Sequence, residues 1–500
     1  MKARIHTLIS AISDQMYERQ HIMALSLLAG VAGINTFLYG HPGTAKSLIS
    51  RRIASAFEVT EYFEYLMNRF STPEELFGPV SIKALKEDQY IRKTEHYLPR
   101  ADFAFLDEIW KASPAILNTL LTLVNEKIFK NGDLIQQVPL NVLMSASNEI
   151  PEPNQGLDAL YDRFIMRLVV EPITEVFNFH ALLQAKPAQA KLNIDGALKI
   201  KKQELQDWRM QMHEVQIPHS VLAVFDDIRL RLKHSFEDHQ IYVSDRRWQR
   251  VAYLLKAAAF LDQRDQLLLA DVYILKHCLW GQVEEISWLG KAVMDAVDEA
   301  GLQFDSELEA LTQEKEQLEQ QILNAFYYTD DVYESYLIGD KEYLRAVTNL
   351  DQYYKDKQLY LELDKMGTKQ DFFAVDQSGE EVRGIVCNYN GTRMCTLKGG
   401  YYGLEEVVSP YIKYSKGSQR DQVSEQQIQL LSQTLQDLKS RIEADNTLQK
   451  IRFENEAQAF ESAFVQPVDL EHLQQMIEQR KERYALQLQD CARLEQLCQS

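Results

Sequence analysis

The chain has 500 residues, of which 45% are hydrophobic and 25% charged, as in folded globular proteins rather than disordered ones. At roughly 150 residues per domain, this length predicts about three domains. The formal net charge of −19 counts against passive coating of nucleic acid, because that binding depends mainly on Lys and Arg side chains that neutralise phosphates. Most of the acidic excess lies in residues 301–500, whose net charge is −14, whereas residues 1–300 carry −5.

The cysteines are too few for a disulfide framework, and none forms a C-x-x-C pair for zinc or redox chemistry. They are Cys278, Cys387, Cys395, Cys491 and Cys498. Reduced thiols in a cytoplasmic protein are therefore expected, and the N-terminal residues contain no evident secretory signal.

The first 170 residues alternate between strand-like and helix-like stretches, which predicts an α/β fold with a mostly parallel sheet. Between Arg19 and Lys46 no residue is charged, so this segment is long enough to imitate a membrane span. Gly30 and Gly33 interrupt it, and we therefore expect a buried helix followed by a strand. The apolar runs expected to form buried strands are 35–39, 102–106 and 142–147.

Residues from about 195 to 300 show helical patterns throughout, and residues 303–328 form an acidic amphipathic pattern. Between about 330 and 420 glycine and tyrosine are enriched, and short β-type runs predict a small β domain. Beyond it, apolar residues at steps of three and four predict a coiled-coil-like helix over 428–442, and a last helix is expected over 470–497. A β domain is therefore predicted within a set of long helices.

A phosphate-binding loop follows the first expected strand. Residues 40–47 read GHPGTAKS and precede a helix that begins at Leu48. In such a loop the backbone N–H groups and the helix N-terminus hold phosphates, while Lys46 reaches the β and γ oxygens and Ser47 binds Mg²⁺. Ala45 replaces the usual glycine before the lysine, a change that is tolerable if Ala45 adopts right-handed helical angles at the helix start.

Two acidic residues follow the expected strand 102–106. Asp107 and Glu108 would lie at the carboxyl edge of the sheet, where open α/β sheets bind ligands. We expect Asp107 to orient Mg²⁺ and Glu108 to polarise the attacking water. An Asp-Glu pair is commonly a solvated strand end, but its position downstream of a phosphate loop favours the functional interpretation.

Three further polar residues complete the candidate site, each with an ordinary structural alternative. Asn148 follows the strand 142–147 and is placed either to orient the water or to form a turn. Arg163 lies at a helix end, where it either reaches the γ-phosphate of a neighbouring subunit or makes a surface salt bridge. Arg246 opens a helix and is expected to close over the phosphates from above, with Arg247 as the fallback.

Together these motifs resemble the MoxR group of AAA+ ATPases, and within it the RavA type. The resemblance spans about residues 5–290, and Ala45 fits the pattern of the group. It rests on Tyr17-Glu-Arg, residues 40–47, Phe70 to Pro79, Phe105 to Leu121, Asn125-Glu126, Ser145 to Glu149, Tyr161 to Phe164 and Val243 to Trp248.

The resemblance implies a role for each site residue. It implies Lys46 in Walker A, Asp107 and Glu108 in Walker B, Asn148 as sensor 1, Arg163 as arginine finger and Arg246 as sensor 2. The residues implied to bind ATP are Tyr17, Gly40, Gly43, Thr44, Ala45, Lys46, Ser47 and Leu48. Tyr17 stands where such proteins contact the adenine, although core packing explains a tyrosine there equally well.

The resemblance also implies a layout and partners. The expected domains are an α/β AAA+ core over 1–190, an all-α lid over 191–300, a long-helix domain over 301–329 and 421–500, and an inserted β domain over 330–420. Such ATPases use ATP and Mg²⁺ and act as hexamers with a von Willebrand factor A-domain protein. The RavA type also binds an inducible lysine decarboxylase through its inserted domain.

The leading interpretation is an ATP-hydrolysing, ring-forming regulator with chaperone-like activity on protein partners. One alternative is an AAA+ nucleic-acid motor or clamp loader, which the acidic composition disfavours. Another is a nucleotide-binding scaffold without significant turnover, which the intact set of Lys46, Asp107 and Glu108 disfavours. No nucleic acid and no integral membrane segment are expected.

Overall fold

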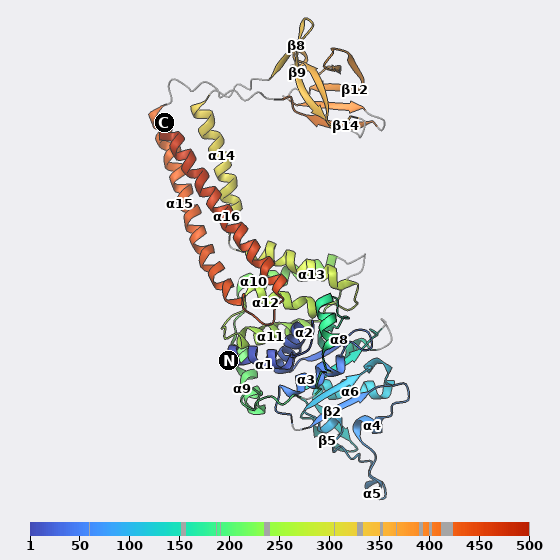
Figure 1. Ribbon diagram of the computed structural model, residues 1–500. Helices are drawn as coiled ribbons and strands as arrows, with labels where there is room; N and C mark the ends of the chain where they lie inside the picture. The colour runs from blue at the N-terminus through green and yellow to red at the C-terminus, as the bar shows by residue number, and fades with distance from the viewer. Residues whose placement is uncertain are drawn as a thin grey trace. The chain divides into compact units, whose positions relative to one another are not determined.

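The computed structural model describes residues 1–59, 61–151, 157–186, 188–190, 192–234, 241–304, 306–327, 334–350, 354–366, 368–389, 394–399, 403–411 and 424–499. Its contacts divide the chain into two compact units, Met1–Leu308 with Glu443–Leu486 and Glu309–Ile442 with Gln487–Ser500. Figure 1 shows the α/β part, the long helices and an antiparallel sheet. The boundaries expected at 329/330 and 420/421 lie outside the described residues.

The first unit is built on a five-stranded parallel sheet in the order β2-β3-β6-β1-β7. Its strands are β1 (Asn35–Tyr39), β2 (Tyr62–Leu66), β3 (Phe103–Asp107), β6 (Val142–Ser147) and β7 (Phe164–Val169). The central strands β3, β6 and β1 are the three apolar runs of the sequence, and nearly all of their residues are buried. A parallel sheet covered on both faces requires such runs, and the predicted α/β core is confirmed.

Two buried apolar clusters cover the sheet. One contains α1 (Lys2–Ile12), α2 (Gln20–Ala32) and α3 (Lys46–Ser55), and the other contains α4 (Pro73–Phe77) and α6 (Pro114–Glu126). Phe37 and Leu38 are neighbours in β1 but belong to different clusters, so the clusters lie on opposite faces. The apolar segment that imitates a membrane span is thus core, as expected.

Within the described ranges, no helix combines the length and the apolar character that crossing a membrane requires. The remaining short elements of this part are α5 (Ile82–Leu85), β4 (Ile128–Asn131), β5 (Leu134–Gln137), α7 (Asp158–Tyr161) and α8 (Val176–Gln184).

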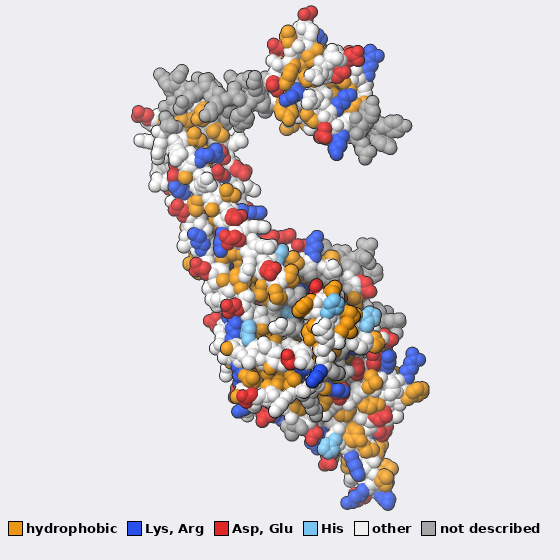
Figure 2. Space-filling view, viewed as in Figure 1, with side chains coloured by type: hydrophobic (Ala, Val, Ile, Leu, Met, Phe, Trp, Pro, Cys, Tyr) orange, Lys and Arg blue, Asp and Glu red, His pale blue; other side chains and the backbone are white. Residues whose placement is uncertain are grey.

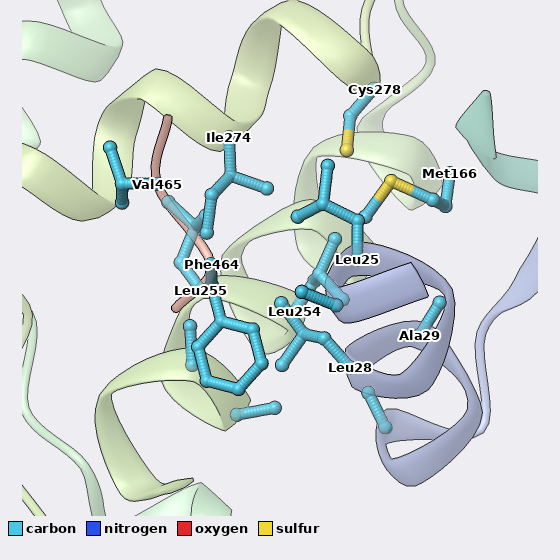
Figure 3. Packing of buried hydrophobic residues seen from close by; sticks show 14 of the residues in the cluster. Leu25, Leu28, Ala29, Met166, Leu254, Leu255, Ile274, Cys278, Phe464 and Val465 are labelled. Atoms are coloured by element: carbon cyan, nitrogen blue, oxygen red, sulfur yellow. The ribbon is translucent and has the colours of Figure 1, made fainter. Parts of the chain in front are cut away.

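The predicted all-helical region is confirmed. It contains α9 (Lys202–Gln211), α10 (His219–His234), α11 (Asp245–Leu261), α12 (Leu269–Val272) and α13 (Glu285–Ala296). Figure 3 shows its packing against α2 and β7, with Leu254 of α11 near Leu28. Phe464 and Val465 lie in the same core, although they come from the segment between α15 (Glu425–Glu456) and α16 (Pro467–Gln499).

The second unit contains a seven-stranded antiparallel sheet in the order β14-β13-β12-β11-β10-β9-β8, which confirms a small β domain. Its strands are β8 (Ser335–Ile338), β9 (Lys341–Thr348), β10 (Lys357–Glu362), β11 (Phe372–Val375), β12 (Glu381–Tyr389), β13 (Cys395–Gly399) and β14 (Leu404–Val408). The third long helix is α14 (Leu308–Phe326). Ion pairs join it to its neighbours, among them Lys315–Asp490 at 2.7 Å and Arg441–Glu314 at 2.9 Å. All five cysteines are buried and free.

Candidate functional site

The phosphate loop, the Asp107-Glu108 pair and Asn148 meet at one edge of the parallel sheet. Tyr39, the last residue of β1, is opposite Ser147 at the end of β6, and Asp107 at the end of β3 is opposite Ala146. The amide of Gly40 donates to the Ser147 carbonyl at 3.2 Å. Residues 40–48, 107–108 and 148 therefore converge where the strands end, the usual position of ligands in such sheets.

The backbone of the loop explains its glycines. A Cβ on Gly40 would lie 2.3 Å from the Val170 carbonyl oxygen, so no larger residue fits against the end of β7. Gly43 has φ of 83°, a left-handed conformation that favours glycine. Thr44 closes the turn, because its hydroxyl donates to the His41 carbonyl at 2.9 Å.

Lys46 is buried at the start of α3. Its ammonium donates to the carbonyl oxygens of Gly40 at 2.7 Å and His41 at 2.9 Å. Burial lowers its pKa, while Asp107 and Glu108 oppose that shift. A buried ammonium with two acidic neighbours, beside a turn of backbone amides, suits a polyphosphate.

Ala45 corrects one prediction. Right-handed helical angles were the condition under which alanine was expected to be tolerable here, but Ala45 has φ of 71° and ψ of 23°, in the left-handed region. The prediction was wrong because α3 begins only at Lys46, so Ala45 belongs to the turn and not to the helix. A Cβ in this conformation costs roughly 1–2 kcal/mol, and the loop carries that strain.

Ser47 and Asp107 have the donor set expected for Mg²⁺. The Ser47 hydroxyl donates to Asp107 Oδ2 at 3.3 Å, which brings a hydroxyl and a carboxylate from two different elements together. Both are hard oxygen ligands of the kind that Mg²⁺ takes beside phosphates. Burial raises the pKa of Asp107, partly offset by the amide of Glu108. A buried carboxylate of this kind gains from a cation, so the residues fit the metal.

Glu108 and Asn148 lie beside this pair. Glu108 has φ of 53°, and its Oε2 accepts from the Ser147 hydroxyl at 3.5 Å and pairs with Lys111 at 3.0 Å. The Oδ1 atom of Asn148 is buried without a hydrogen-bond partner among the described residues. An unsatisfied buried oxygen is costly and rare, so its position at the strand edge fits a group that meets water or phosphate.

Arg163 and Arg246 lie at the opposite edge of the sheet. The Arg163 carbonyl accepts from the side chain of Asn35 at 3.0 Å, at the amino end of β1. The loop follows the other end of that strand, roughly 13 Å away at about 3.3 Å per residue. The Asn125 Oδ1 atom accepts from Arg163 Nε and, at 3.2 Å, from Arg246 Nη2.

This arrangement corrects the prediction for Arg246. It does not close over the phosphate loop of its own chain, because α11 begins at the amino edge, beside Arg163. The fallback Arg247 does not reach the loop either, since its side chain is buried and donates to the Trp280 carbonyl at 3.2 Å.

The two arginines line a pocket of about 110 Å³ together with Lys127, Arg250 and Asp162. The Asp162 carboxylate pairs with Arg163 at 3.3 Å, so Arg163 makes a salt bridge within its own chain, and the cations outnumber this one acid. Burial and the charges of Arg209 and Arg250 lower the pKa of Lys127 to about 8. Burial and then the charge of Arg163 lower the pKa of Arg246. Cations held this close are relieved by an anion, so the pocket suits a phosphate group.

A second cavity of about 290 Å³ lies beside the phosphate loop. Val169 and Glu171 line it and flank Val170, whose amide donates to the Tyr39 carbonyl at 2.7 Å. Glu18 and Arg19 line it too, directly after Tyr17, but no contact places Tyr17 itself in the cavity. The position suits a base whose phosphates lie on residues 40–48.

Two histidines face each other in this cavity. The Nε2 atoms of His21 and His277 are 3.4 Å apart, so one nitrogen donates and the other accepts. Burial lowers the pKa of His21 to about 4, and burial and then the charge of His21 push that of His277 well below its ordinary value. Both rings are therefore neutral near pH 7 and offer hydrogen bonds without charge.

Comparisons with known proteins agree with this geometry. Residues 3–210 match the family described as the MoxR domain in MoxR-vWA-beta-propeller ternary systems, and residues 220–293 match an AAA lid domain. Two uncharacterized proteins of Methanocaldococcus jannaschii are 37% and 38% identical over 308 and 275 residues, which cover 61% and 55% of this chain and 78% and 70% of those proteins. The chain belongs to the MoxR family of AAA+ ATPases. A crystal structure from Cytophaga hutchinsonii, described as a candidate ATPase, is 18% identical with a TM-score of 0.46 and covers 59% of this chain and 94% of that one.

Some residues of this MoxR-family site were not predicted from the sequence. His21, His277 and Gln466 line the second cavity, and no motif or spacing marks any of them. Asn125 stands in a motif of the family, but nothing in the sequence indicates that it holds two arginines. Contacts between residues that are distant in the sequence, such as Asn125 and Arg246, carry no local signal.

Proposed function

We propose that this MoxR-family protein hydrolyses ATP with Mg²⁺ at the carboxyl edge of its parallel sheet. The observation that carries the proposal is the convergence of the loop 40–48 with Asp107, Glu108 and Asn148. Lys46 holds the β and γ oxygens, and the amides of the loop bind the phosphates from the other side. Ser47 and Asp107 would hold Mg²⁺, which neutralises phosphate charge when bound.

The remaining groups act on the water. Glu108 polarises the water that attacks the γ-phosphorus, and Asn148 orients the same water through its free Oδ1 atom. Lys111 forms an ion pair with Glu108 Oε2 at 3.0 Å, which helps to hold this carboxylate in place. The products are ADP and phosphate.

We further propose that each site is completed by a neighbouring subunit. Arg163 and Arg246 lie together at the edge away from their own loop, so they can serve only another chain's γ-phosphate. This supports a ring, for which six subunits is the size expected of the family, with chaperone-like action on protein partners. The matched family description supports a von Willebrand factor A-domain protein as one of them.

The nucleic-acid alternative finds little support. The chain has a net charge of −19, and acidic and basic side chains are interspersed over the face that Figure 2 presents. The RavA-type assignment and the lysine decarboxylase partner of residues 330–420 stay predictions. A pull-down with and without those residues tests them.

Replacing Glu108 by Gln tests the proposed chemistry. Because Gln accepts a hydrogen bond but no proton, we expect hydrolysis to fall at least about 100-fold while ATP still binds. The exposed Glu87→Gln change is the matched control and should leave both unchanged. Unaltered hydrolysis in Glu108→Gln would contradict the assignment of the base.

A further inference from the structure

The segment that joins α15 and α16 reaches the cavity beside the phosphate loop. Gln466, the residue before α16, lines this cavity together with His21, His277 and Trp280. The other lining residues come from the first 300 residues of the chain, so Gln466 is a contribution from far along the sequence.

This segment is firmly anchored. Phe464 and Val465 are 1% and 4% exposed and pack in the core with Leu255 and Ile274, as Figure 3 shows. On the other side of Gln466, Asp469 forms an ion pair with Lys276 at 2.6 Å. Gln466 is therefore held from both sides, at the start of a long helix.

Lys276 also fixes which way the Gln466 amide points. Its ammonium donates to Gln466 Oε1 at 2.9 Å, and an ammonium has no acceptor, so the atom beside it must be the carbonyl oxygen. The Nε2 group, with two N–H donors, is left on the other side of the amide. Gln466 thus brings to the wall of the cavity an amide whose donor group faces away from Lys276, and the two imidazoles line the same cavity.

We propose that Gln466 is a base-contacting residue of the nucleotide site, whose Nε2 group donates to an acceptor nitrogen of the purine ring. This inference rests on the proposed function, because it takes the cavity to hold the base of the bound nucleotide. Since Gln466 also accepts the first backbone bonds of α16, from Asp469 at 3.0 Å and Leu470 at 3.2 Å, base binding stabilises the first turn of that helix. The start of α16 therefore responds to the nucleotide.

The test compares ADP with pyrophosphate, each with Mg²⁺, by calorimetric titration of the full chain. Pyrophosphate occupies the phosphate loop without a base. We expect Gln466→Ala to weaken ADP binding about threefold to tenfold and to leave the affinity for pyrophosphate unchanged. Gln466→Glu keeps an acceptor for Lys276 but lacks the donor. It should therefore weaken ADP binding at least as much, without loosening the segment between α15 and α16.

The control is Gln475→Ala, an exposed glutamine on the same helix, which should bind both ligands as the parent does. Hydrogen exchange gives the second readout: ADP should protect the amides of Asp469 and Leu470 more than pyrophosphate does, and Gln466→Ala should abolish that difference. Equal ADP affinity in all three variants, or equal protection by both ligands, would overturn the inference. A parent that binds neither ligand would instead refute the proposed function itself.

Discussion

Ala45 and Glu108 both hold left-handed backbone angles beside the phosphate site, with φ of 71° and 53°. Neither is a glycine, so each carries a conformational cost of order 1–3 kcal/mol that the surrounding structure must offset. Ala45 lies in the turn directly before α3, and Glu108 directly follows β3, so both strained residues lie next to the groups expected to meet the phosphates.

The strain at Ala45 predicts an unusual effect of glycine. Ala45→Gly should raise the free energy of unfolding by about 1 kcal/mol, because glycine adopts this φ without a steric penalty. Ala252→Gly, in the middle of α11, should lower it by about the same amount, because glycine is a poor helix former. Chemical denaturation of both variants measures the two changes in the free energy of unfolding. Changes of the same sign would contradict the strain at Ala45.

Asn125 is predicted to position the two arginines. Its single Oδ1 atom accepts from Arg163 and Arg246, whose charges repel each other. Asn125→Ala should lower ATP hydrolysis by about tenfold or more, because a misplaced arginine finger loses part of the rate that its removal would lose. The affinity for ADP should stay unchanged. Asn118→Ala, an exposed change on the same helix, is the control. A matching loss of ADP affinity would argue for a structural role instead.

At the scale of secondary-structure elements, the hydrophobic pattern of the sequence identified the strands and helices whose buried residues follow a regular pattern. β1, β3 and β6 are apolar runs, and α9, α10 and α11 have helical periodicity. β7 was not singled out because the buried Arg167 interrupts its apolar run, donating to the carbonyls of Phe164 and Tyr161. β2 is one of the two edge strands of the sheet and is only partly buried, so its hydrophobic pattern is weak.

The local sequence pattern also limited how much of the candidate site could be predicted. Residues 40–48, 107, 108 and 148 could be grouped from the sequence because each follows a recognisable strand, and parallel strands end at one edge. The position of Arg246 could not be predicted, because it depends on where α11 packs and not on the local sequence. The backbone conformation of Ala45 could not be predicted either, because the φ of a single residue is set by the turn around it.

The junction of α15 with α12 predicts a pH dependence. Glu456 is buried and accepts from the Leu269 amide at 2.8 Å, and burial raises its pKa from 4.5 to about 8, with Asp271 adding to the shift and Arg264 and Arg452 opposing it. Between pH 4.5 and 8 the folded protein thus keeps a proton that the unfolded chain releases. Stability from this group is present at low pH and is lost as the pH rises through that window.

Glu456→Gln keeps the hydrogen bond but cannot titrate. Denaturation at pH 5 and at pH 8.5 should show that the variant gains stability relative to the parent at the higher pH, by more than about 1 kcal/mol. Other titrating groups cancel in this difference, since both proteins share them. An unchanged difference between the two pH values would contradict the raised pKa.

At the scale of the whole molecule, the site is divided between two edges of one sheet. The phosphate loop and its acids lie at the carboxyl edge, and the two arginines lie at the amino edge, so under the proposed function a complete site needs two chains. Hydrolysis should therefore depend on assembly, and Arg163→Ala should lower it by roughly 10³–10⁵ without preventing ATP binding.

Mixing two inactive variants tests this division most directly. Arg163→Ala keeps the loop and Glu108, whereas Glu108→Gln keeps the arginine, so a mixed ring contains interfaces with every group intact. Equal amounts of the two variants, dissociated and reassembled together, should regain about a quarter of the parent's rate of hydrolysis. Random assembly pairs an intact loop with an intact arginine at about a quarter of the interfaces. A mixture no more active than the two variants measured separately would contradict the account.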